Sequence, residues 1–155
     1  MLPNRIVDFV QGPYLMVVST RDDRLFPCGD WAFGAMAQAE HDSVTIFLPD
    51  ALHEANIRNA RSNGKIALVM GHDDGHETYQ LKGDYIRDRP CTDEDRAIQE
   101  VYRMKLVTKW KPEMGELIER IVERLPYAKS TALTFRVREI FDQTPGPNAG
   151  RHGEF

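Results

Sequence analysis

The chain has 155 residues, enough for one domain with a substantial buried core. Hydrophobic residues make up 41% and charged residues 28% of it, which favours a folded globular protein over a disordered one. The net charge of −4 argues against a broad nucleic-acid-binding surface, which would need a basic excess.

The sequence gives no sign of a membrane segment or an export signal. No apolar run approaches the length that crosses a bilayer, and Pro3 and Asp8 interrupt the N-terminus where a signal peptide would be apolar. The two cysteines, Cys28 and Cys91, form no CxxC pair. We therefore expect a cytoplasmic protein without a structural disulfide.

The first half of the chain reads mainly as strands. A short helix is expected over residues 3–11, before Gly12 and Pro13. Strand patterns, rich in β-branched and aromatic residues, cover residues 14–20, 25–38, 44–48 and 65–70. Residues 21–24 are a polar turn, and Pro27 and Gly29 indicate a bulge or a sheet edge. A helix that Asp50 can cap separates the last two strands and runs to about Asn63.

The second half of the chain predicts a hairpin, a helix pair and a last strand. Residues 73–75 form a turn, and residues 78–87 return as an alternating strand. Thr92 precedes an acidic first turn, so a helix is expected from there to about Thr108. Pro112 fits the first position of a third helix. The apolar residues of that helix share one face and predict core packing: Met114, Leu117, Ile118, Ile121, Val122 and Leu125.

The last predicted strand, residues 133–142, alternates clearly. One face carries Leu133, Phe135, Val137 and Glu139, and the other carries Thr134, Arg136 and Arg138. The proline-rich and glycine-rich residues 145–150 end the regular structure, so residues 142–155 are expected to form an extended C-terminal tail.

The order of elements predicts a mainly β fold with helices, of the α+β class. Strands dominate and pair mostly with their sequence neighbours, which favours an antiparallel barrel with peripheral helices. A doubly wound parallel sheet would need more strand–helix alternation, and no GxGxxG follows a strand. We expect residues 1–155 to form a single domain.

Three segments, in this order, resemble the pyridoxamine 5′-phosphate oxidase-like family. They are the strand–turn–strand LMVVSTRDDRLFPCGDWAFGAMA, the strand–helix–strand IFLPDALHEANIRNARSNGKIALVM, and the strand ETYQLKG, which ends in Gly after a charged residue. The C-terminal IFDQTPGPNAG resembles the tails of some members. The resemblance covers most of the chain, and its main support is the order and spacing of the segments.

The resemblance implies a six-stranded split β-barrel, a homodimer, and FMN in the cleft between subunits. Members include vitamin-cofactor oxidases, flavin reductases, nitro-compound reductases, haem-handling proteins and deazaflavin-dependent enzymes, so no substrate follows. We therefore predict an FMN-dependent oxidoreductase acting on an unidentified small molecule, with NAD(P)H as a candidate electron donor.

Two alternatives remain open within the same fold. The first is a non-catalytic flavin carrier, store or sensor, because no substrate-binding cluster stands out. The second is a haem-binding or haem-degrading protein. Its candidate axial ligands are His53, His72, His76 and His152.

The expected phosphate contacts lie on and after the helix over residues 50–63. Family members often place a Ser-Arg-Lys-like cluster before this helix, whereas this chain has Asp50-Ala-Leu-His-Glu54, whose acidic start would repel a phosphate. The phosphate is then expected to contact His53, Arg58 or basic residues of neighbouring strands. Together with Asn56 and Lys65, these residues are candidates for cofactor binding.

The expected flavin-ring contacts lie on two strands. Gly29 permits close backbone approach beside Asp30, and Trp31 is expected to stack on the ring or border it, unless it is a core or interface residue. Gln80 is a candidate partner of a flavin carbonyl or ring nitrogen. Lys82, on the same strand face, is a candidate for the phosphate, although a solvent-facing polar stripe would give the same pattern.

No residue is assigned to catalysis, because no convincing acid–base pair stands out. The motif His72-Asp-Asp-Gly-His76 contains two histidines and two carboxylates, but its spacing matches no defined zinc site and Asp74-Gly75 indicates a hairpin. Cys28 is read as a small apolar residue. We therefore predict no metal.

Overall fold

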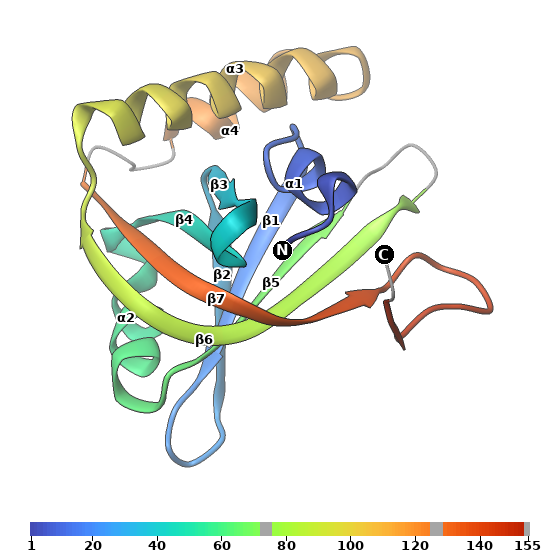
Figure 1. Ribbon diagram of the computed structural model, residues 1–155. Coiled ribbons are helices and arrows are strands. Elements are labelled where there is room, and N and C mark those ends of the chain that lie inside the picture. The colour runs from blue at the N-terminus through green and yellow to red at the C-terminus, as the bar shows by residue number, and fades with distance from the viewer. Residues whose placement is uncertain (72–75, 125–128, 154–155) are drawn as a thin grey trace.

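The structure, a computed structural model, describes residues 1–71, 76–124 and 129–153 (Figure 1). Its helices in these residues are α1 (Asn4–Val10), α2 (Asp50–Asn63), α3 (Asp93–Met114) and α4 (Glu116–Arg124), with a short 3-10 helix at Ala39–His41. Its strands there are β1 (Leu15–Arg21), β2 (Pro27–Ala32), β3 (Ala35–Gln38), β4 (Ser43–Pro49), β5 (Lys65–Gly71), β6 (Thr78–Pro90), β7 (Ser130–Asp142) and β8 (Arg151–His152).

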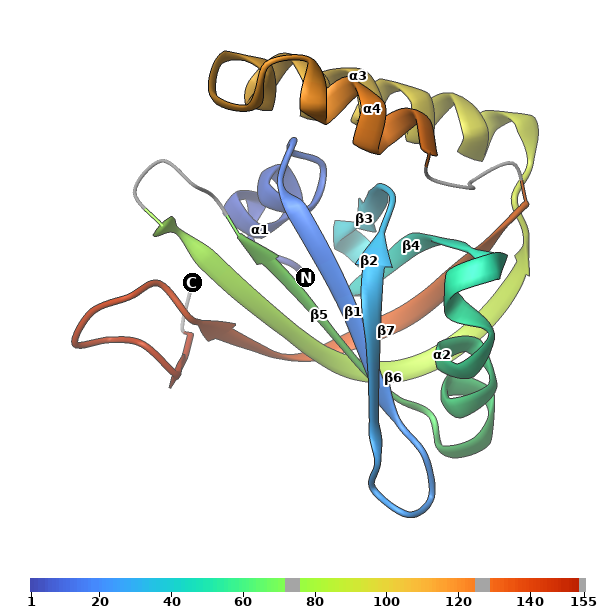
Figure 2. The same cartoon turned by 180° about the vertical axis from the view of Figure 1, so that it is seen from behind.

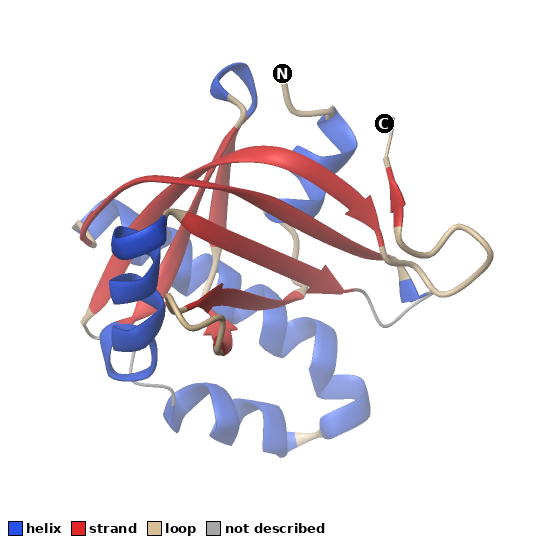
Figure 3. Cartoon of the chain, turned by 90° about the horizontal axis from the view of Figure 1, so that it is seen from below, coloured by secondary structure: helices blue, strands red, loops and turns tan. Residues whose placement is uncertain are grey.

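The described strands form one antiparallel sheet in the order β2-β1-β5-β6-β7-β4-β3, with β8 added to β7. The sheet curves around a shared interior, and the helices lie outside it (Figures 2 and 3). The predicted mainly β, α+β barrel with peripheral helices is confirmed. The structure has more strands than the six expected. Residues 25–38, which were expected to hold one or two strands, hold β2 and β3, and the tail adds β8.

The chain closes the barrel where it passes from β2 to β3. Phe33 donates its N–H to the carbonyl of Phe47 in β4 at 2.9 Å, and Phe47 donates to the carbonyl of Gly34 at 3.0 Å. Gly34 has a φ of +98°, which side-chain-bearing residues rarely adopt. The predicted sheet edge at Pro27 and Gly29 is confirmed, because β2 has only β1 as its ladder partner in the described sheet, with a regular register.

The interior of the barrel is filled by side chains. Alternate residues of the strands point inward, and the largest fully buried ones there are apolar: Phe135, Met16, Ile46, Leu48, Leu68, Met70, Leu81 and Leu133, with Tyr79. Phe47, on the other face of β4, is buried in a separate small cluster with Cys91 and Ala132. In β5 this leaves Ala67 and Val69 half-buried on the outer face. The apolar run of β5 therefore serves two surfaces, the core and the outside of the sheet.

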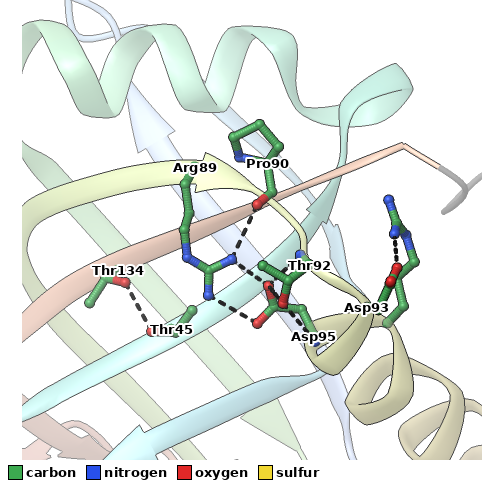
Figure 4. A network of polar contacts seen from close by, with 8 residues as sticks. Thr45, Arg89, Pro90, Thr92, Asp93, Asp95 and Thr134 are labelled. Atoms are coloured by element: carbon green, nitrogen blue, oxygen red, sulfur yellow. Dashed lines mark hydrogen bonds and ion pairs between the residues drawn. The ribbon is translucent and has the colours of Figure 1, made fainter.

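Helix α3 begins as predicted and ends later. The Thr92 side chain accepts a hydrogen bond from the backbone of Asp95, whose carboxylate accepts one from the backbone of Thr92 and also binds Arg89 (Figure 4). This reciprocal cap fixes the first turn. The helix then continues through Pro112 to Met114, so the expected helix start at Pro112 was wrong.

The second helix of the pair starts after Gly115, whose φ is +58°. Pro112 cannot donate one helical hydrogen bond, because it has no N–H. It does not end α3, which continues for two more residues to Met114. Ile118 and Val122 of α4 are buried, which confirms core packing for this face, whereas Leu117 is exposed. Leu125 lies outside the described residues. In the described chain, no helix is both long and apolar enough to cross a membrane.

A bulge between β6 and β7 changes which residues face outward. Lys82 pairs with Glu139 and Gly83 pairs with Val137, so Arg138 is the extra residue. Glu139 is therefore exposed beside Lys82, and its expected position on the Val137 face was wrong. The alternation of β7 continues after the bulge with its phase reversed, and Ile140 packs against the core.

The C-terminal segment turns back rather than extending away. The N–H of Gly150 donates to the carbonyl of Asp142 at 2.7 Å, and that of Gly153 donates to Ile140 at 2.8 Å. β8 thereby pairs with the end of β7, at Phe141 and Asp142. The expected extended tail is a hairpin over its described part.

Gly83 is expected to be essential for the bulge. A Cβ placed there would lie 2.0 Å from the carbonyl oxygen of Arg136, so Gly83→Ala must displace the backbone of β7. We expect it to lower the free energy of unfolding by at least about 3 kcal/mol, measured by urea denaturation. Gly71→Ala is the matched control, because a Cβ at Gly71 meets only the Thr78 hydroxyl, at 3.5 Å. Equal stability losses in both variants would refute this account.

Candidate functional site

The outer face of β1, β2, β5 and β6 carries two rows of cross-strand neighbours. The first row contains Trp31, Val17, Val69, Gln80 and Phe141. The second row contains Gly29, Ser19, Ala67, Lys82 and Glu139. The first row is mostly apolar and ends in the exposed Trp31, which keeps 44% of its surface in contact with solvent. The second row begins with three small residues.

The second row lies along a hollow of about 540 Å³, here called the outer groove. Residues that line it are Ser19, Thr20, Arg21, Lys65, Ile66, Ala67, Lys82, Gly83, Asp84, Arg138 and Glu139. Ser19 and Ala67, next to Gly29, have small side chains, so the surface of the sheet is recessed at this point. A Cβ on Gly29 would approach the Ser19 hydroxyl to 3.1 Å and would fill part of the same surface. The volume is in the range of small-molecule and cofactor sites.

Basic side chains dominate one end of the outer groove. Arg21, Lys65, Lys82 and Arg138 line it, against two carboxylates, Asp84 and Glu139. Asp84 accepts from Lys65 Nζ and from Arg138 Nε, each at 2.8 Å. These two bonds hold the pKa of the Asp84 carboxyl below its ordinary value. Because Asp84 shares one charge between two cations, the groove retains a positive excess that suits an anion.

Lys82 and Gln80 are both oriented by the C-terminal segment. Lys82 Nζ lies 4.4 Å from the centroid of the Phe141 ring, a cation–π contact. Gln143 Nε2 donates to Gln80 Oε1 at 3.4 Å, and the Gln143 backbone N–H donates to Thr78 at 2.8 Å. The carbonyl of the Gln80 amide is therefore engaged by the tail, and its NH₂ group is the end that can donate to a ligand.

His53 belongs to a buried polar network behind β1 and β2. Its Nε2 donates to the carbonyl of Trp31 at 2.7 Å, and its Nδ1 accepts from Asn56 Nδ2 at 3.1 Å. Thr20 Oγ1 donates to Asn56 Oδ1 at 2.8 Å and accepts from Asn59 Nδ2 at 3.2 Å. These partners require the neutral imidazole with its proton on Nε2. The network ties α2 to the edge of the sheet.

This network excludes two of the expected cofactor contacts. His53 and Asn56 have no exposed surface, and both ring nitrogens of His53 are already bonded. Neither can contact a phosphate while this network is intact, and neither lines the outer groove.

Asp50 does not cap α2. The helix follows Pro49 without a side-chain cap, and Asp50 instead accepts a hydrogen bond from the Thr131 hydroxyl at 2.7 Å.

Five of the nine expected residues lie together on the outer face. These are Gly29, Trp31, Lys65, Gln80 and Lys82. Asp30 alternates to the other face of β2, where its carboxylate accepts the Trp31 N–H at 2.7 Å. Arg58 is on the exposed side of α2 and does not line the outer groove. The basic residues at the groove belong to strands. Basic residues of neighbouring strands were one of the three phosphate contacts that the sequence analysis proposed.

Sequence reasoning missed Ser19, Arg21 and Arg138. The first two could have been found, because the alternation of β1 puts residues 17, 19 and 21 opposite the buried Met16 and Val18. The alternation of the last strand did place Arg138 on an outward face, but its position beside Asp84 depends on the bulge. Arg21 was read as the start of a turn, whereas it is the last residue of β1.

The three described histidines among those proposed for haem have different surroundings. His53 is buried and fully bonded, His76 is exposed, and His152 packs edge-on against Phe141 with ring centroids 5.3 Å apart. His72 lies outside the described residues, as does most of the motif at residues 72–76. Across the parts of the chain that are described, no three His, Cys, Asp or Glu side chains converge as metal ligands.

Solved structures with the same fold confirm the split-barrel prediction. HupZ from Group A Streptococcus aligns over 97% of this chain and 100% of its own, with 19% identity and a TM-score of 0.55. An FMN-binding protein from Syntrophomonas wolfei covers 89% of this chain and 83% of its own, with 11% identity and a TM-score of 0.59.

A third structure has a related description. A putative pyridoxamine 5′-phosphate oxidase from Lactobacillus delbrueckii covers 90% of this chain and 93% of its own, with 11% identity and a TM-score of 0.53. No protein-family model and no curated protein matches the sequence. At these identities the likeness establishes the fold, which is that of the pyridoxamine 5′-phosphate oxidase-like split barrels.

Burial of His53 predicts a specific pH dependence of stability. Desolvation lowers the pKa of its imidazole below 6.5, although the bond to Trp31 and the charge of Asp30 oppose this. Below pH 6.5 the unfolded chain therefore binds more protons than the folded one, and stability falls as the pH decreases towards the folded-state pKa. The slope contributed by this residue reaches at most about 1.4 kcal/mol per pH unit.

The measurement is urea denaturation between pH 7.5 and 5. His53→Gln should flatten the slope below pH 6.5, whereas His41→Gln, at an exposed position, should leave it unchanged. Proton NMR of the native imidazole gives a second readout that does not depend on the variant folding. A folded-state titration of His53 at or above pH 6.5 would contradict the assignment of a neutral buried ring.

Proposed function

We propose that this protein binds FMN in the outer groove and, as a cytoplasmic homodimer, transfers hydride or electrons between FMN and a small molecule. The observation that carries the proposal is the arrangement of the outer face. The apolar first row, which ends in Trp31, borders the small residues of the second row. A cluster of basic side chains lies at one end of the groove. This combination suits a flat ring system joined to a phosphate.

The side chains present fit the chemical groups of FMN. Arg21, Lys82 and Arg138 would hold the phosphate, with the guanidinium groups suited to bidentate contact. The NH₂ group of Gln80 would donate to a ring carbonyl or nitrogen, and Gly29 and Trp31 would border the ring. Two of the structural neighbours are named an FMN-binding protein and a putative pyridoxamine 5′-phosphate oxidase, which supports this cofactor.

The role of the chain is to bind and orient. Bound FMN supplies hydride and electron transfer, for which the protein needs no side-chain base. Lys65 and Arg138 are held by Asp84, so the basic end of the groove is fixed before a phosphate arrives. Gln143 fixes the Gln80 amide in the same way. Reduction of the loaded protein by NADH or NADPH would separate an oxidoreductase from a passive carrier.

A second copy of the chain is proposed to cover the first row of the outer face. Trp31 is exposed, and Val17 and Val69 beside it are half-buried, so a sheet face that includes the open edge strand β2 presents apolar surface. A two-fold partner would bury this row and exclude water from the adjoining groove. The free cysteines Cys28 and Cys91 are consistent with a reducing cytoplasm.

FMN binding is tested by absorption spectra after FMN is added and the protein is desalted. We expect retained flavin bands, and Lys82→Met should weaken FMN about tenfold while changing riboflavin little, because riboflavin has no phosphate. Lys129→Met is the control, since Lys129 is exposed and does not line the groove. A colourless protein that takes up no FMN would overturn the proposal, and a Soret band on haem titration would then favour the haem alternative.

Dimerisation is tested separately by light scattering at micromolar concentration. Wild-type protein should have the mass of a dimer, and Trp31→Glu should shift it to the monomer because a charge would be buried in the interface. Ile86→Glu is the matched control, since Ile86 is also 44% exposed but lies outside the first row. A monomeric wild-type protein, or equal dissociation in both variants, would contradict the proposed interface.

A further inference from the structure

A second hollow lies at the other end of the barrel, where α3 passes α1 and β3 (Figure 1). It has a volume of about 410 Å³ and takes its walls from three separate elements. Val10 comes from α1, Met36 from β3, and Ile98, Val101 and Lys105 from α3. It shares no lining residue with the outer groove.

The hollow continues along α3 into a more open one of about 590 Å³. Val101 and Lys105 line both parts, and Met104, Thr108 and Lys109 are added in the second. We call the two parts together the α3 groove. From Ile98 to Thr108 the helix rises roughly 15 Å, so the groove suits an elongated ligand rather than a compact one.

Part of the apolar lining of the α3 groove belongs to the core, as Val10 and Tyr102 do, and part of it does not. The core-facing side of the helix is formed by Tyr102 and Leu106, and the Tyr102 hydroxyl donates to the carbonyl of Tyr14 at 2.6 Å. Val101 and Met104 lie beside this side but remain 45% and 55% exposed. Large apolar side chains that are left exposed along a groove indicate a surface that binds a ligand or a partner.

The charges of the α3 groove select the kind of ligand. Lys105 and Lys109 line it, and among the residues that the structure describes no carboxylate lines either part. This is a local departure in a chain whose net charge is −4. Thr108 adds a hydroxyl between the two lysines. A ligand with an apolar body and one anionic head would place its head near Lys105 and Thr108. Its body would lie along Ile98, Val101 and Met36.

We propose that the α3 groove binds the carboxylate of a linear fatty acid. Lys105 and Thr108 hold the carboxylate, and the hollow between α1, β3 and α3 takes the chain. This site is independent of the proposed FMN site, because the two are lined by different residues. A failure of FMN binding therefore does not bear on it, and the reverse also holds.

The test is calorimetric titration of the full-length protein with octanoate, decanoate and dodecanoate, below their micelle concentrations. Each added methylene that is buried should tighten binding roughly threefold to fourfold. Decanol, which has the same chain without the charge, should bind more weakly than decanoate. A flat chain-length series, or no binding of any of the three acids, would overturn the proposal.

Two variants locate the binding site. Lys105→Met should weaken decanoate about fivefold and leave decanol unchanged, because it removes an exposed charge but keeps the apolar stem. Ala97→Trp, at an exposed helix position that lines the groove, should fill the chain end and abolish binding of both. Lys129→Met should match the wild type.

Three results would refute the site. Decanoate binding that survives both Lys105→Met and Ala97→Trp would place it elsewhere. An equal effect of Lys105→Met on decanoate and decanol would remove the role of the charge. A change of molecular mass in Ala97→Trp, measured by light scattering, would show that a second copy of the chain covers the groove instead of a small molecule.

Discussion

Two backbone hydrogen bonds join the two ends of the sheet, from Phe33 to Phe47 and from Phe47 to Gly34. They close the barrel, and the positive φ of Gly34 allows the chain to cross the seam. Once closed, the barrel has an interior that is filled by apolar side chains, with Ile46, Leu68 and Phe135 showing no exposed surface. Ligands are therefore left with the outer face of the sheet or the space between barrel and helices, and the larger hollows lie in these two places.

The outer face depends on the network behind it. The His53 ring binds the carbonyl of Trp31, and Thr20 is bonded to Asn56 and Asn59. Helix α2 therefore fixes both β1 and the edge strand β2 from the face opposite the outer groove. An edge strand with a single ladder partner is otherwise the part of a sheet most prone to fraying. The buried polar groups of α2 thus act on the outer groove through the backbone, although none of them reaches it.

Alternation along the strands made much of this structure predictable. It placed Gln80 and Lys82 opposite the buried Tyr79 and Leu81, and the same rule applied to β1 would have found Ser19 and Arg21. It failed at Glu139, because the bulge arises from the contact between Gly83 and the backbone of Arg136, which no local pattern reveals. The burial of His53 could not be predicted, because a helix with apolar and polar residues on every face does not show which face meets the sheet.

The C-terminal hairpin shows how a segment with little regular structure can complete a site. Its prolines and glycines predicted an end to the regular structure and an extended tail, yet the hydrogen bonds of Gly150 and Gly153 return it to β7. This return sets Gln143 against Gln80 and His152 against Phe141, the ring on which Lys82 rests. Gln80 and Lys82 are the two β6 side chains proposed to contact the ring and the phosphate. The tail therefore helps to hold the side chains proposed to contact the ring and the phosphate. Its own residues do not line the groove.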